Sequence, residues 1–142
     1  MSVRETALAA LSARLGAALA ARNPAPKVLR NDTVPQRLPA GGLVVVRDGE
    51  TVEETPILSP LAWAVEHRAE VEVVAATGAL LDELLVDITA AITGDRALGG
   101  AVEWAQPGAP SFDDAETEGA AAARAASVPV TLSFTVASSP LA

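Results

Sequence analysis

Residues 61–76, with the sequence LAWAVEHRAEVEVVAA, constrain the fold more than any other part of the chain. One set of alternating positions is apolar apart from a histidine, and comprises Trp63, Val65, His67, Ala69, Val71 and Val73. The intervening set comprises Ala64, Glu66, Arg68, Glu70 and Glu72. A period of two is typical of a β-strand with one buried and one polar face. The polar face must meet water, a lumen or a polar partner, which predicts a sheet covered by helices on one side only.

Two stretches with helical spacing can supply that cover. The first, predicted over residues 2–22, opens with a capping box in which Ser2 and Glu5 each bond to the other's backbone, and it ends at Asn23-Pro24. The second begins at Thr77 as the N-cap and ends at Gly94, which we expect in a left-handed conformation, with Leu98 folding back on the helix end. Their buried stripes are predicted to be Leu8, Leu11, Leu15 and Leu19, and Leu81, Leu84, Leu85, Ile88 and Ile92.

Four further segments complete the prediction. Residues 27–32 form a short strand, and residues 43–54 form a hairpin with Asp48-Gly49 at its turn, the pair preferred in type I′ connections. Residues 101–106 form a short strand that places Val102 and Trp104 on a core face, and we expect Trp63 to fill the core as well. A last strand points Val128, Val130, Leu132, Phe134 and Val136 inward.

Residues 107–127 have the least regular pattern. They open with prolines and a glycine and carry Asp113, Asp114, Glu116 and Glu118. The alanines that follow favour a helix, but short isolated helices are marginal, so we predict a mobile acidic loop. Its carboxylates would suit calcium in number, yet they lack the spacing and the glycine of an EF-hand.

The order of these elements predicts an α+β fold. We expect one domain over residues 1–142, with a mixed or antiparallel β-sheet and two main helices packed on one face. A chain of 142 residues is long enough to bury a core of its own.

Charge and composition narrow the classes of function. The formal net charge is -8, so most of the surface repels nucleic acid, although an acidic surface suits a passage through which DNA slides without binding. There is no cysteine, which excludes disulfides, thiolate zinc sites and cysteine nucleophiles. We find neither a signal peptide nor an apolar run of the ~20 residues that span a bilayer, and we expect a protein made and kept inside the cell, with no membrane partner.

The sequence contains almost no candidates for catalytic or ligand-binding residues. His67, the only histidine, would act as a general base in a catalytic interpretation, but no nucleophile, metal ligand or second base accompanies it, so we interpret it as a half-buried strand residue. Glu66, Glu70 and Glu72 share a strand face with Arg68, which favours a solvated or partner-facing surface over a glycosidase pair. The glycines lack phosphate-loop spacing. We predict no catalytic residue, cofactor or metal.

The layout of the chain resembles that of one protein family. The strand WAVEHRAEVEVVA runs into the helix LLDELLVDITAAI, which ends in GDRALGG, and VPVTLSFTV closes the chain. Together with the N-terminal helix and VRDGE, this is similar to the tail terminator (minor tail protein U-like) family of long-tailed phages and phage-derived gene transfer agents. The likeness is strongest over Val65–Val102, and the acidic tract around Asp113–Glu118 matches no family feature.

The resemblance implies a structural virion protein, made in the bacterial cytoplasm, that forms a six-membered ring on the head-proximal end of the tail tube. The ring stops tube polymerisation and gives the head or its connector a docking surface, while DNA passes without specific binding. Its partners would be further copies of itself, the tail tube protein and the connector or stopper protein. We hypothesise that the lumen or an adjacent ring meets one of two acidic surfaces: Glu66, Arg68, Glu70 and Glu72, or Asp113, Asp114, Glu116 and Glu118.

Two alternatives stay open at this point. A head–tail joining protein of the stopper or connector type would also form rings without catalysis. A small non-viral module with an acidic groove for a cationic ligand would be monomeric and would not touch tail tubes.

Overall fold

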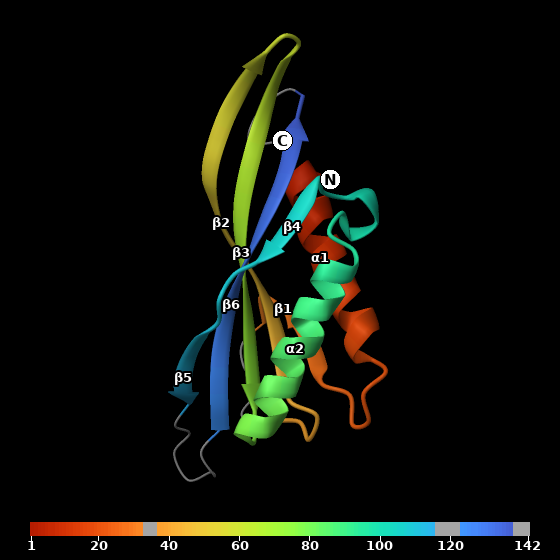
Figure 1. Ribbon diagram of the computed structural model, residues 1–142, viewed down its shortest axis with the longest axis vertical. Helices are drawn as coiled ribbons and strands as arrows, with labels where there is room; N and C mark the ends of the chain where they lie inside the picture. The colour runs from red at the N-terminus through yellow and green to blue at the C-terminus, as the bar shows by residue number, and fades with distance from the viewer. Residues whose placement is uncertain (33–36, 116–122, 138–142) are drawn as a thin grey trace.

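The computed structural model describes residues 1–32, 37–115 and 123–137. The elements in chain order are α1 (Val3–Leu19), β1 (Lys27–Arg30), β2 (Leu43–Leu58), β3 (Leu61–Ala75), α2 (Gly78–Gly94), the short 3-10 helix η1 (Leu98–Gly100), β4 (Trp104–Pro107), β5 (Ser111–Ala115) and β6 (Ala123–Val136). The strands form one sheet in the order β1-β2-β3-β6-β4, and β5 also pairs with β6 (Figure 1). Among the strands of the described residues, β1 and β2 are parallel and the other pairs are antiparallel.

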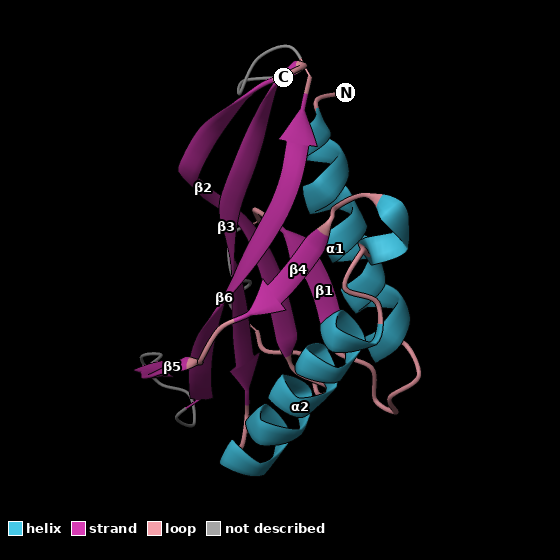
Figure 2. Ribbon diagram, turned by 45° about the horizontal axis from the view of Figure 1, so that its top comes forward, coloured by secondary structure: helices cyan, strands magenta, loops and turns pink. Residues whose placement is uncertain are grey.

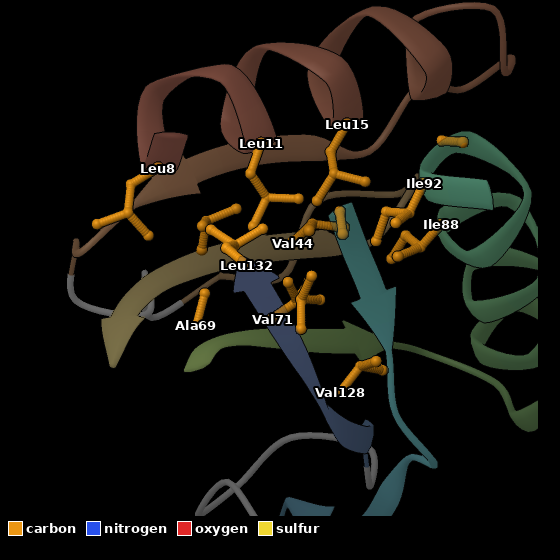
Figure 3. Packing of buried hydrophobic residues seen from close by; sticks show 14 of the residues in the cluster. Leu8, Leu11, Leu15, Val44, Ala69, Val71, Ile88, Ile92, Val128 and Leu132 are labelled. Atoms are coloured by element: carbon orange, nitrogen blue, oxygen red, sulfur yellow. The ribbon is translucent and has the colours of Figure 1, made fainter. Parts of the chain in front are cut away.

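Both α-helices lie on the same side of the sheet, as Figure 2 shows. The fold is therefore the predicted single α+β domain with a mixed sheet and two helices on one face. At the start of β2 the other face is covered as well, because Leu43 and Val45, which lie opposite Val74 and Glu72, are fully buried. The leucine stripe of α1 and the apolar stripe of α2 are buried at every predicted position. They pack onto valines of β2 and β3 and onto inward residues of β6, as the close view of the core shows (Figure 3). The core is aliphatic because the chain supplies few aromatic side chains to fill it.

β3 confirms the alternation that the sequence predicts. Val65, Ala69, Val71 and Val73 are buried toward the helices, while Glu66 and Arg68 are exposed on the other side. β6 likewise buries its five predicted inward residues. Trp63 is partly buried and packs against the core, as expected of it.

The predicted hairpin turn at Asp48-Gly49 is wrong. β2 continues through these residues to Leu58 and turns back at Ser59-Pro60 into β3. The register between the strands shifts at Arg47/Glu50, so Asp48-Gly49 is a β-bulge, and a second shift follows at Thr51/Glu53. A bulge with glycine at φ +68° uses the same left-handed backbone as a type I′ turn, which is why the dipeptide suits both.

The end of α2 also differs from the prediction. Gly94 is the last residue of the helix, and the left-handed residues are Leu98, Gly99 and Gly100 further along. The Asp95 backbone N–H donates to the Ile92 carbonyl, and the Asp95 carboxylate accepts from the Gly99 N–H at 2.9 Å. These hydrogen bonds end the helix without a left-handed glycine at Gly94, and the chain changes direction only at η1. Leu98 is buried there, as predicted.

The segment predicted as a mobile loop at residues 107–127 contains strands at both ends. Residues 111–115 form β5, which pairs with residues 123–127 of β6. Pairing with the edge of a sheet provides hydrogen-bond partners for the backbone N–H and C=O groups of a segment, even when its side chains do not alternate as in a strand. Because this pairing does not depend on alternation, the sequence pattern does not predict it. Glu116 and Glu118 lie outside the described residues.

Trp104 does not occupy the core. It begins β4, where Ala105 is the buried residue, and half of Trp104 is exposed. The Arg96 guanidinium lies 4.4 Å from the centre of the Trp104 ring, a cation–π contact that covers one face of the indole. Val102, which precedes the strand, is buried as predicted.

An ion-pair group ties α1 to the sheet. The Ser2 hydroxyl caps α1 by accepting from the Glu5 N–H at 3.0 Å, but the Glu5 carboxylate is bound by Arg30 of β1, at 2.5 and 2.8 Å, instead of reaching back to Ser2. Arg30 also donates to Asp48 at the first bulge, at 3.0 Å from Nη2. The hydrogen bond from Arg30 lowers the pKa of Glu5 below its ordinary value of 4.5.

This pair gives the fold a defined acid dependence. Because the pKa of Glu5 is lowered in the folded state, its contribution is complete above pH 4.5 and is lost as the pH falls through the lowered pKa. Glu5→Gln is therefore expected to be less stable than the parent chain at neutral pH, with a difference that shrinks below pH 4.5. Urea unfolding midpoints across a pH series measure the difference. A gap that stays constant into acid would contradict the Glu5–Arg30 pairing.

Candidate functional site: the open face of the sheet

The side of the sheet away from the helices is the candidate site, and we call it the open face. On β3 it carries the predicted row Glu66, Arg68, Glu70 and Glu72, of which the first two are exposed and the last two are partly buried. The register extends the row onto both neighbouring strands. Ser133 and Thr131 of β6 lie opposite Glu66 and Arg68, and hydroxyl groups therefore flank the charges on that side.

β2 adds more charge to the open face. Partners in the antiparallel register share a side, so the residues opposite the β3 row lie on the open face as well. Between Arg47 and Glu72 the two strands place seven charged residues there: the acids Glu50, Glu53, Glu66, Glu70 and Glu72, and the bases Arg47 and Arg68. The face is therefore acidic.

Two of the acids are neutralised or held by neighbours. Arg47 Nη2 lies 3.3 Å from Glu72 Oε2, and the Ser127 hydroxyl donates to Glu70 at 2.9 Å. Glu72 and Glu70 are thus fixed at the end of the sheet nearer to α2's first turn. Closer to the turn of the hairpin, two glutamates face each other across the strands.

Glu53 and Glu66 lie directly opposite each other across β2 and β3. Like charges in this position destabilise a strand pair, so the fold keeps this arrangement at a cost. A hollow of about 180 Å³ opens beside them, and Glu103 and Ser133 also line it. Glu103 accepts from the Thr135 hydroxyl at 2.6 Å. Three carboxylates therefore concentrate negative charge around one shallow hollow in the middle of the open face.

Of the second predicted acidic surface, the structure describes the side chain of Asp113 alone, and this residue lies near the first surface. Asp113 is exposed on β5, and the register aligns it with Ala125 of β6 and Val74 of β3, which places it on the open face two positions beyond Glu72. Asp114 pairs in the backbone with Arg124. The structure thus joins Asp113 and the β3 row on one face, although the sequence separates them by about 40 residues.

His67 is on the opposite side and has a structural role. It is buried, with 3 % of its surface exposed. Its Nδ1 lies 3.0 Å from the Thr51 hydroxyl, and its Nε2 bonds to the Asp48 backbone carbonyl. Because a carbonyl only accepts, the proton of the neutral ring belongs on Nε2, and Nδ1 accepts from Thr51. Both nitrogens bond to residues at the bulges of β2, and the ring is buried where the sequence predicts a half-buried strand residue.

The chemistry of the remaining groups is limited. Among residues 1–32, 37–115 and 123–137, no three His, Cys, Asp or Glu side chains are placed to hold a metal ion. Within the same residues no helix is long and apolar enough to cross a membrane. What the open face can do is repel anions and accept hydrogen bonds or cations over a broad area.

Sequence reasoning missed Glu50 and Glu53 as members of the site. The predicted hairpin with a turn at Asp48-Gly49 would pair them with the residues before the turn. In the structure they pair with Arg68 and Glu66 of β3. The signal that could have found them is the length of β3: a strand of 15 residues is expected to have a partner of similar length, and β2 has 16.

Comparison with protein-family models and with curated proteins gives no match for this chain.

Proposed function

We propose that the protein is a tail terminator: a structural virion protein that forms a ring on the head-proximal end of a tail tube. In this role it stops tube polymerisation and provides the surface on which the head or its connector docks. The observation that carries the proposal is the acidic open face on a sheet whose other side is filled by two helices. The second support for the proposal is the resemblance of Val65–Val102 to the tail terminator family.

The acidic face suits the rim or lumen of a ring that DNA traverses. DNA carries a high density of phosphate charge, and proteins bind it by presenting Lys and Arg. A lumen lined with glutamate offers no such contacts and lets DNA move without being held. Glu53, Glu66 and Glu103, which gather at one hollow, are the residues most suited to this role.

The shape suits a ring as well. Cyclic rings are built from heterologous contacts, in which two different surfaces of each subunit meet. The β2–β3 hairpin extends beyond the helices at one end of the molecule, and β5 lies at the other end (Figure 1). The subunit therefore presents different surfaces at its two ends, as ring formation requires.

Tail length in a producer strain lacking this gene tests the proposal. We expect electron micrographs of the lysate to contain overlong tubes without heads, because nothing caps polymerisation, and complementation by the wild-type gene should restore normal length. Tails of normal length that are not attached to heads would assign the protein to head–tail joining instead. Intact and functional particles would exclude a role in the virion.

A further inference from the structure

Two apolar surfaces of the chain are left uncovered by its described residues. The first, which we call the hairpin tip, is the end of the β2–β3 hairpin at residues 55–62. Leu58 is 81 % exposed there, and Ile57 and Leu61 are exposed beside it. No charged residue occurs between Thr55 and Val65.

The second surface, which we call the α2–β5 groove, runs between the outer side of α2 and the start of β5. Leu85, Val86, Ala90, Pro110 and Phe112 supply its apolar lining, two threonines complete it, and Asp82 is its one charged residue. Phe112 is 69 % exposed and Val86 is 59 % exposed. The groove has a volume of about 470 Å³. An apolar cavity of about 150 Å³ holds a benzene molecule, so this groove has room for two or three side chains of leucine size.

The two surfaces belong to opposite ends of the molecule. The hairpin tip is at the top of Figure 1, whereas β5 and the first turns of α2 are at the bottom. A chain therefore cannot place its own tip in its own groove. A contact between them joins two molecules, uses a different surface on each, and repeats from copy to copy.

The distribution of charge favours a second copy of this chain as the occupant. At a net charge of -8, copies repel one another over most of their surfaces. The hairpin tip brings no carboxylate, and the groove that receives it contains only Asp82. A contact between these two surfaces therefore buries apolar area while keeping the acidic regions of both copies in water.

We propose that the hairpin tip of one subunit inserts into the α2–β5 groove of the next, with Leu58 and Leu61 packing against Val86 and Phe112. This contact is the heterologous interface that closes the ring. The inference rests on the proposed function, which supplies the number of subunits and the end of the tube on which the ring forms. The open face lies outside this contact and stays available to DNA or to an adjacent ring.

Crosslinking between introduced cysteines tests the interface, because the chain has no cysteine of its own. The double variant Leu58→Cys/Phe112→Cys, treated with a short bis-maleimide, is expected to give a ladder of covalent multimers that ends at the closed ring. A mixture of the two single variants should stop at covalent dimers, since each chain then carries only one half of the contact. Leu58→Cys/Ala17→Cys is the matched control, because Ala17 is exposed on α1 away from the groove, and it should give no ladder.

The same variants are crosslinked as purified full-length protein and on purified particles, after circular dichroism confirms an unchanged melting temperature. Absence of the ladder from both preparations, with tails of normal length, overturns the interface but leaves the terminator function intact. Crosslinking of the tip to the tube protein or connector also overturns it, since the occupant is then another protein. A ladder from a chain whose gene deletion leaves tails unchanged supports the interface and removes the proposed function.

Discussion

Replacing Gly49 with alanine is expected to lower the free energy of unfolding by about 2–5 kcal/mol. At φ +68° a side chain costs about 1–2 kcal/mol. A Cβ atom would also lie 1.8 Å from the Arg68 carbonyl oxygen, so strand β3 has to move, and overpacking of this kind costs ~1–3 kcal/mol. Urea unfolding followed by circular dichroism measures the change.

Gly16→Ala is the matched control for this substitution. Gly16 lies within α1, and a Cβ there meets no atom within 4 Å. Because alanine favours a helix over glycine, the variant should be more stable than the parent by ~0.5–1 kcal/mol. An unfolding midpoint for Gly49→Ala equal to that of the parent would contradict the bulge at Asp48-Gly49.

Reversing a charge on the open face should abolish much of the particle's function while leaving the fold intact. In Glu66→Lys or Glu53→Lys, a repulsive pair across β2 and β3 becomes an attractive one, so the free energy of unfolding should not fall. In the proposed ring each lysine is repeated in every subunit and offers phosphates a contact that they otherwise lack. We expect infection or gene transfer to drop at least about tenfold, the factor that ~1.4 kcal/mol of added DNA retention produces.

Glu54→Lys separates this effect from a general change of charge. Glu54 is also an exposed glutamate of the same strand, but it lies opposite Val65 and therefore on the other side of the hairpin from Glu53. The net charge of the chain changes equally in both variants. Particles with Glu54→Lys should stay close to wild-type activity. Equal loss in the two variants would show that total charge, and not the open face, is what matters.

The sequence predicts the parts of this fold whose side chains carry a period. β3 alternates with period two from Val65 to its end, and the stripes of α1 and α2 repeat with helical spacing, so the sequence predicts their buried residues correctly. Burial imposes these periods, because a residue on the wrong side exposes apolar surface or buries charge. Half of the candidate site follows from the same reasoning, since Glu66, Glu70 and Glu72 alternate with buried residues.

The sequence-based predictions are wrong where backbone pairing or a single contact, and not a repeated side-chain pattern, determines the structure. Asp48-Gly49 has the local chemistry of a turn, and only the long-range pairing with β3 makes it a bulge. β5 forms because an edge of β6 is free to accept it, not because SFDDA prefers a strand. Trp104 leaves the core because Arg96 stacks on its ring and Ala105 occupies the buried position. The pairing partners of the bulge and of β5 are distant in the sequence, and the contact between Arg96 and Trp104 follows no periodic pattern, so the patterns that place the core do not place them.

The position of β6 has a consequence for how the chain is made. This strand follows β3, β4 and β5 in the sequence, yet it lies between β3 on one side and β4 and β5 on the other. While the ribosome is still adding residue 123, β3 has no neighbour on that side, and β4 and β5 have nothing to pair with. The sheet can therefore be completed only after β6 has been synthesised, and its apolar face stays vulnerable to aggregation until then. Chains cut short before β6 are expected to be cleared by proteases, so that only chains that contain β6 accumulate.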